Sequence, residues 1–126
     1  MDVSAALLTE GYGVRFRAGG GSMTPAIGDG DVITVKPIAP ASLAPGRVIV
    51  YRDCDRVFAH RIVDVRADRT RPEHLIVRGD AARDCDAPIA PSQVLGEVVS
   101  VSPRGDRRRG IVGLLQRAAA VALGAL

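Results

Sequence analysis

The sequence predicts a mainly β domain. Six short segments are apolar or alternate apolar and polar residues, which is the pattern of strands. Turns rich in Gly, Pro and Asp separate these segments, and no strand–helix–strand alternation occurs, so a Rossmann-like fold is not expected. We expect a small β sandwich or a partial barrel, with a short helix towards each end of the chain.

The first three expected strands follow one another at close spacing. In Val14–Ala18, apolar residues alternate with two arginines. The second strand, Asp31–Pro37, reads DVITVKP, and the third, Arg47–Arg52, reads RVIVYR. A helix is expected before them at Val3–Glu10, and Gly11 is its stop signal.

The last three expected strands follow polar connections. Val57–Val65 comes after a tight Asp-Cys-Asp connection, and the polar turn Ala67–Pro72 follows it. His74–Arg78 is the fifth strand, and Val94–Val101 closes the set after the long polar loop Gly79–Pro91.

The composition is that of one globular domain with a tail. The chain has 126 residues, of which 47% are hydrophobic and 25% charged. The net charge is only +3 and aromatic residues make up 3%, so a nucleic-acid partner is not expected. Two cysteines, Cys54 and Cys85, are too few for a disulfide framework, and two free thiols are favoured over a single bridge.

We divide the chain into a domain, 1–103, and a tail, 104–126. The tail starts with a basic run and continues with an apolar segment at helical spacing. We expect this helix to dock on its own domain or on a partner; the alternative is peripheral contact with an anionic membrane surface. Residues Met1–Gly11 lack the basic start and the apolar stretch of a secretory signal peptide. The expected location is therefore cytoplasmic or peripheral to a membrane.

One serine is a candidate nucleophile. Ser22 follows three glycines, on a turn that could present its hydroxyl and its amide to an incoming carbonyl. Its neighbours Gly21 and Met23 are the candidates for contacts with the substrate or an oxyanion. The alternative is an ordinary Gly-Ser turn.

A nucleophilic serine needs a base, and the candidates are Lys36, His60 and His74. His60 alternates with Phe58 and Ile62, so it is expected to face an apolar layer. The alternative for His60 is a core histidine bonded to a backbone carbonyl. His74 and Lys36 are expected to be exposed.

Three aspartates, Asp80, Asp84 and Asp86, lie in the loop after the fifth strand. One of them could orient His60 and stabilise its imidazolium form. The alternative is turn formation. No metal-ligand spacing is recognised, and neither a metal nor a cofactor is expected.

Five short motifs occur in one order along the chain. They are Gly21-Ser22-Met23-Thr24-Pro25, Gly30-Asp31, Ala59-His60-Arg61-Ile62, Arg78-Gly79-Asp80 and Val94-Leu95-Gly96-Glu97-Val98-Val99. In this order they resemble the type I signal peptidases, which are related to the LexA-like self-cleaving peptidases. The resemblance covers about residues 14–101 and implies a LexA-like or signal-peptidase-like catalytic core.

The match is closest to the histidine-using branch, which comprises the archaeal, endoplasmic-reticulum and sporulation-type signal peptidases. Ser22 then matches the nucleophile and His60 the base, while Asp80 and Asp86 match two aspartates, either of which could orient His60. The resemblance implies a serine endopeptidase that cuts an extended peptide or protein after small residues through an acyl-enzyme.

The chain also departs from that family. Gly46-Arg47 stands where members usually have Gly-Asp, and no N-terminal membrane anchor is recognised. The resemblance therefore supports a peptidase core more than signal-peptide processing in a membrane. Two alternatives remain: self-cleavage at Ala18-Gly19 in the LexA-like manner, and a non-catalytic binding module that retains the fold.

A truncation after Ser102 tests the tail. If the tail is a surface anchor, truncation abolishes flotation of the protein with anionic liposomes while cleavage of a soluble peptide persists. Each basic residue near such a surface contributes about 1 kcal/mol, so flotation of the full chain also weakens as salt is added. Unfolding of the truncated protein in circular dichroism would instead make the tail part of the core.

Overall fold

The computed structural model describes residues 13–69 and 71–103. The elements, in chain order, are β1 (Val14–Arg17), β2 (Val32–Lys36), the single-turn 3-10 helix η1 (Pro40–Ser42), β3 (Val48–Asp53), β4 (Arg56–Asp68), β5 (Arg71–Arg78), the 3-10 turn η2 (Pro91–Gln93) and β6 (Val94–Ser102). The prediction of a mainly β fold is confirmed. The expected terminal helices, at Val3–Glu10 and in 104–126, lie outside the described residues.

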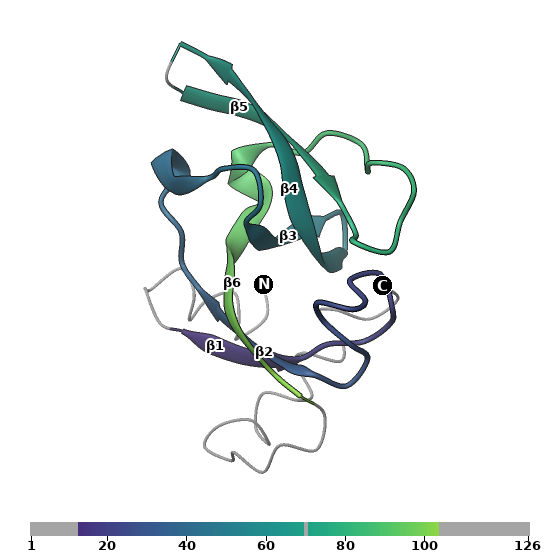
Figure 1. The fold of residues 1–126 in the computed structure, drawn as a ribbon. Coiled ribbons are helices and arrows are strands. Elements are labelled where there is room, and N and C mark those ends of the chain that lie inside the picture. The colour runs from purple at the N-terminus through teal and green to yellow at the C-terminus, as the bar shows by residue number, and fades with distance from the viewer. Residues whose placement is uncertain (1–12, 70, 104–126) are drawn as a thin grey trace.

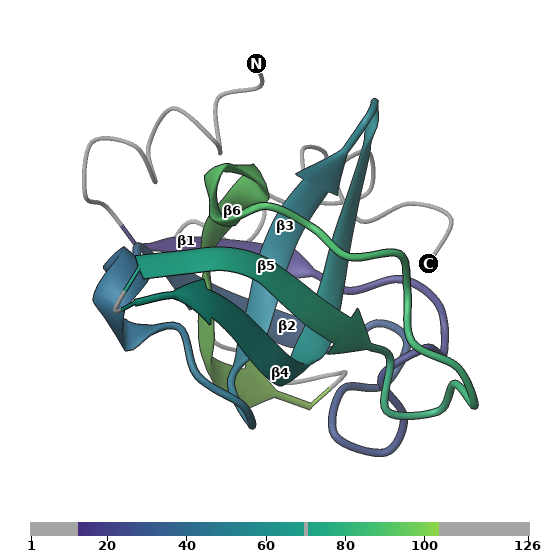
Figure 2. The same cartoon turned by 90° about the horizontal axis from the view of Figure 1, so that it is seen from above.

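The strands form one open antiparallel sheet in the order β1-β2-β6-β3-β4-β5. The last strand in sequence, β6, lies inside the sheet, between β2 and β3 (Figure 1). The register shifts on both sides of β6, between Thr34 and Val35 on β2 and between Val50 and Tyr51 on β3. Such irregularities increase local bend and twist. In Figure 2, β3 accordingly runs across the direction of β1.

Both faces of β3 and of the first half of β4 contribute to buried apolar clusters. Val50 of β3 and Ala59 of β4 belong to one apolar cluster, together with β1, β2 and the β1–β2 loop. Ile49 and Tyr51 of β3 belong to a second cluster, together with Ile62 of β4 and residues of β5. Successive side chains of a strand point to opposite faces, so a strand between two clusters is apolar along its whole length. This explains the continuous apolar run of β3.

The β4–β5 hairpin is longer than predicted. Residues 67–72 were expected to form a polar turn, but Ala67 pairs with Pro72 and Asp68 with Arg71. The ladder continues here between strands whose side chains are mostly exposed, so no apolar alternation reveals it in the sequence. The turn itself includes Arg69, whose φ is 56°.

Both cysteines, Cys54 and Cys85, are exposed free thiols. Within 13–69 and 71–103, no helix has the length and apolar character needed to cross a membrane.

One position of β6 has no room for a side chain. A Cβ atom on Gly96 would lie 2.6 Å from the Lys36 carbonyl oxygen and 2.7 Å from Cγ1 of Val35. Both partners belong to β2, and the oxygen is backbone. A side chain at this position would therefore push β2 and β6 apart.

We expect Gly96→Ala to lower the free energy of unfolding by about 1–3 kcal/mol, the usual cost of overpacking. Gly19→Ala is the matched control, because no heavy atom lies within 4 Å of the Cβ it would add. The control is expected to stay within about 0.5 kcal/mol of the unsubstituted protein. Urea unfolding curves measure both variants, and equal midpoints would contradict the close approach of β2 and β6.

Candidate functional site

Lys36, a candidate base, and His60, the predicted base, lie on different strands of the sheet, at positions connected by a row of paired residues. Lys36 pairs with Glu97, Glu97 with Ile49, and Ile49 with His60. At the usual strand spacing, three steps along this row correspond to roughly 14 Å between the two backbones. Lys36 is also exposed, as predicted. The structure therefore does not bring Lys36 into a site with His60.

The His60 ring is packed among aromatic side chains on β3 and β4. His60 is 7% exposed, and its ring centroid lies 5.8 Å from that of Phe58 and 6.0 Å from that of Tyr51. Phe58 precedes His60 by two residues on β4, which places both on one face. Tyr51 pairs with Phe58 across the β3–β4 ladder, so it is a diagonal neighbour of His60 on that face.

Asp86 is the aspartate that contacts His60. The loop after β5 returns to that strand through a hydrogen bond from the Asp86 amide to the Val77 carbonyl, 2.9 Å long. The Asp86 carboxylate then reaches His60, with 2.5 Å between Oδ2 and Nδ1. A carboxylate accepts only, so we assign the Nδ1 proton to His60 as the donor. The neutral ring then carries its lone pair on Nε2.

Tyr51 is a third member of this cluster. It was not among the candidate residues, because no sequence pattern pointed to it. Its hydroxyl donates to Asp86 Oδ2 over 2.8 Å and lies 3.3 Å from His60 Nδ1. Burial, together with the neighbouring Asp86 carboxylate, raises the pKa of Tyr51 well above its ordinary value. The phenol therefore stays protonated and serves as a donor. Only the β3–β4 register brings Tyr51 here.

The other ring nitrogen of His60 and the backbone carbonyl of Ser22 both lie close to Gly79. A Cβ atom on Gly79 would lie 3.2 Å from His60 Nε2 and 2.6 Å from the Ser22 carbonyl oxygen. The same carbonyl accepts a hydrogen bond from the Ala81 amide, 3.0 Å long. Among the described residues, His60 Nε2 is the one buried side-chain nitrogen or oxygen without a hydrogen-bond partner. The start of the loop after β5 thus contacts the Ser22 turn and lies close to the imidazole.

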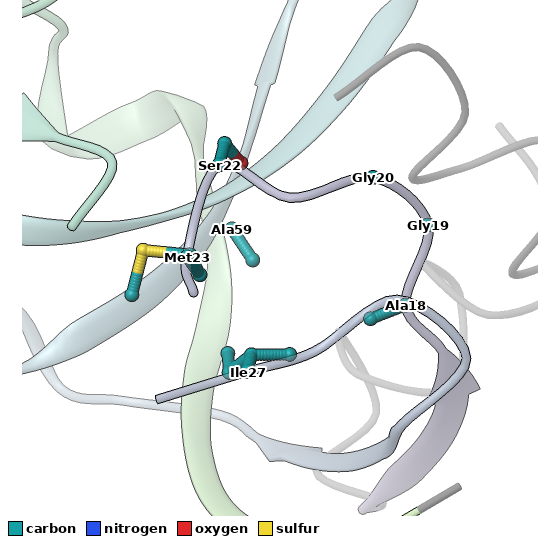
Figure 3. A pocket seen from close by; sticks show the side chains of 7 residues that line it. All are labelled: Ala18, Gly19, Gly20, Ser22, Met23, Ile27 and Ala59. Carbon is teal, nitrogen blue, oxygen red and sulfur yellow. The ribbon is translucent and has the colours of Figure 1, made fainter. Parts of the chain in front are cut away.

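Ser22 is half-buried in the β1–β2 loop. The loop is closed at its base by two hydrogen bonds, from the Ala18 amide to the Asp31 carbonyl and from the Gly30 amide to the Ala18 carbonyl. Its inner side forms a small hollow with Ser22 at the rim, and Ala18, Ile27 and Ala59 point into it (Figure 3). The hollow is therefore apolar in its depth and polar at its edge.

The two turn residues predicted to contact a substrate or an oxyanion have structural contacts. Met23 is 3% exposed, and its Sδ atom accepts a hydrogen bond from the Asp80 amide at 3.3 Å. The Gly21 carbonyl accepts hydrogen bonds from the amide and the hydroxyl of Thr24. Met23 thus joins the Ser22 turn to the loop after β5, and an oxyanion role for either residue stays a prediction.

Asp80 pairs with Arg61 instead of His60. The Arg61 guanidinium binds the Asp80 carboxylate with two hydrogen bonds, 2.9 Å and 2.8 Å long, and a third joins it to the Gly46 carbonyl. The hydrogen bonds from Arg61 lower the pKa of Asp80, and those to Asp80 raise the pKa of Arg61. Asp80 therefore anchors the loop after β5 to β4.

The remaining candidates lie apart from this cluster. His74 is exposed on β5, as predicted, and Asp84 is exposed in the loop. Within the part of the chain that the structure describes, no three His, Cys, Asp or Glu side chains are grouped to hold a metal ion. A comparison of the chain with family models, curated proteins and solved structures finds no match.

Asp80→Asn tests the anchoring ion pair. The folded-state pKa of Asp80 lies below its ordinary value, so the pair stabilises the protein above the unfolded pKa of about 4 and loses this effect as the pH falls through the folded pKa. We expect a loss of about 1 kcal/mol at pH 7, the upper end for a partly exposed pair, and almost none in acid.

The matched control is Asp64→Asn. Asp64 pairs with Arg66 at 3.0 Å, but both side chains are more than half exposed. Thermal unfolding at pH 7 and in acid measures the two variants. An Asp80→Asn loss that does not change with pH, or one that the control matches, would contradict the anchoring role.

Proposed function

We propose that the protein is a serine endopeptidase in which Ser22 is the nucleophile, His60 the general base and Asp86 the residue that orients His60. One observation carries the proposal. The imidazole of His60 is held at Nδ1 by Asp86, while Nε2 is buried, without a partner and beside the turn of Ser22. A buried polar atom without a partner is costly, and a base awaiting a proton accounts for it.

The chemistry follows from these positions. The Ser22 hydroxyl oxygen attacks the substrate carbonyl carbon, and its proton passes to His60 Nε2. The tetrahedral intermediate then collapses: the C–N bond breaks, and His60 gives the proton to the leaving amine. Water attacks the resulting acyl-enzyme and passes a proton to His60, and the acid leaves as the proton returns to Ser22. Asp86 stabilises the imidazolium in both steps.

Ser22 and His60 are not joined by a hydrogen bond in the structure, since Nε2 has no partner. Bonds between nucleophile and base are often long in free enzymes and tighten when substrate binds. The backbone of the Ser22 turn is already fastened to the loop after β5. Catalysis therefore requires the Ser22 hydroxyl to come within hydrogen-bond reach of Nε2 when substrate binds.

Contacts between distant motifs support a signal-peptidase-like core. The motif of residues 21–25 contacts that of residues 78–80 through Met23 and Asp80. The motif of residues 59–62 contacts 78–80 through Arg61 and Asp80. The motif containing Gly96 packs tightly against the end of β2. The motifs of residues 21–25, 59–62 and 78–80 are thus in contact around Asp80, and we propose a LexA-like or signal-peptidase-like fold on this basis.

The hollow beside Ser22 favours small side chains. The space open to the centre of a water-sized sphere is about 10 Å³, which is room for roughly one water-sized group. Ala59 and Ile27 close its depth, so an alanine methyl fits where a larger side chain would displace the core. We therefore propose cleavage after a small residue, with the substrate extended along the sheet edge.

Self-cleavage at Ala18-Gly19 is disfavoured by the structure of the loop. Ala18 is 5% exposed, and both its amide and its carbonyl are hydrogen-bonded at the base of the β1–β2 loop. Cutting there would require the loop that carries Ser22 to come apart. A substrate supplied by another chain requires no such opening.

We expect Ser22→Ala to abolish hydrolysis of an Ala-x-Ala peptide and His60→Gln to be equally severe. Losing one member of such a triad costs on the order of 10⁶-fold in kcat. Two controls remove a serine hydroxyl or a lysine amine elsewhere: Ser42→Ala, at an exposed position of η1, and Lys36→Arg, at the exposed end of β2. Both controls are expected to keep most of the activity. Product formation is followed by mass spectrometry.

Each unexpected result has a definite reading. Equal turnover by Ser22→Ala and the unsubstituted protein would remove Ser22 from the mechanism. A severe loss in Lys36→Arg with a mild one in His60→Gln would replace the histidine base by a lysine. An absence of turnover in every variant, with a peptide still bound, would favour the non-catalytic binding module.

A further inference from the structure

We propose that Tyr51 is a positioning residue of this site, which holds the Asp86 carboxylate in place and thereby directs the lone pair of His60 to Nε2. The inference deepens the proposed function and rests on it. It starts from one oxygen atom: Asp86 Oδ2 accepts both the Tyr51 hydroxyl at 2.8 Å and His60 Nδ1 at 2.5 Å.

The Asp86 side chain needs a hydrogen-bond donor to fix its position, because it lies on a partly exposed loop. It belongs to the loop after β5, between exposed neighbours, and its side chain is 35% exposed. A carboxylate in this position can turn towards water and leave the imidazole without an acceptor. Tyr51, in contrast, is 2% exposed on β3, inside the sheet. A donor on a rigid strand can hold a carboxylate on a loop.

The same contacts determine which ring nitrogen of His60 carries the proton. Since the Tyr51 phenol stays protonated, it offers one proton, and its shorter contact is with Asp86 and not with His60 Nδ1. Nδ1 must then supply its own proton to Asp86 Oδ2. The neutral imidazole is left with its acceptor at Nε2, on the side of Ser22. In the opposite tautomer, a lone pair on Nδ1 would face the carboxylate oxygen at 2.5 Å, which is repulsive.

Packing explains the ring of Tyr51 but not its hydroxyl. The ring stacks on Phe58 with 5.6 Å between centroids and belongs to the second apolar cluster, where a phenylalanine would also fit. The hydroxyl donates its hydrogen bond to the Asp86 carboxylate, which also binds His60. Removing the Tyr51 hydroxyl while keeping the ring therefore tests the positioning role without disturbing the packing.

The test is Tyr51→Phe in a His74→Gln background. The chain has two histidines, and His74 is exposed, so His60 is then the one imidazole observed by NMR. Before the Tyr51 change, the His60 Nδ1 proton should give a sharp far-downfield resonance. In Tyr51→Phe we expect it to broaden through exchange with water. We expect kcat on the Ala-x-Ala peptide to fall by about tenfold or more, with KM held; losses of this size follow when the hydrogen-bond partners of metal-binding histidines are removed.

Ile62→Val is the matched control. Ile62 is buried in the same apolar cluster, and its truncation destabilises the core without removing a hydrogen bond. A sharp, unshifted resonance in Tyr51→Phe would overturn the proposal, whether or not kcat falls. Equal effects of Tyr51→Phe and Ile62→Val on resonance and kcat would overturn it too. If the unsubstituted protein hydrolyses no peptide, the proposed function fails, while the resonance still decides whether Tyr51 holds Asp86.

Discussion

Three separate segments of the chain meet at Gly79, where the structure leaves no space for a side chain. The carbonyl of Ser22 approaches from the β1–β2 loop, and the ring of His60 approaches from β4. Gly79 itself follows the end of β5. The site exists because two backbones and an imidazole can come this close at one residue. A side chain here would collide with the Ser22 carbonyl and crowd the imidazole of His60.

The loop after β5 is held at two of its aspartates by two consecutive residues of β4. Side chains of neighbouring strand residues point to opposite faces, so His60 and Arg61 each meet a different aspartate. His60 contacts Asp86 on one face of the strand, and Arg61 contacts Asp80 on the other. Because β4 is packed between two apolar clusters, its side chains hold the polar loop after β5 in one position. The contacts of Asp80 and Asp86 thus fix the position of this loop.

The polar contacts of the loop after β5 divide into two groups with different partners. The side-chain hydrogen bonds of Asp86 come from Tyr51 and His60. Asp80 is neutralised by Arg61. This separation leaves Asp86 as the carboxylate available to an imidazolium. A carboxylate already bound to a guanidinium would stabilise that imidazolium less.

Much of the fold and part of the site were open to prediction from local pattern. Six strands were predicted close to their observed bounds, because apolar alternation and turn residues are local signals. The paired segment around Ala67 and Pro72 was missed, since strands with two exposed faces show no alternation. Ser22 and His60 were candidates by residue type and by position on a turn and a strand, and the resemblance to the signal peptidases selected them. The structure brings both close to Gly79.

The sequence by itself determined the strands, the turn that carries Ser22 and the face to which His60 points, because each depends on residues a few positions apart. Tertiary structure alone decided which aspartate serves His60, why Met23 is buried and what Tyr51 contacts. These outcomes depend on the sheet order, on the β3–β4 register and on the return of a loop to Val77. Such long-range pairings follow from the packing of the whole chain, and no local pattern specifies them.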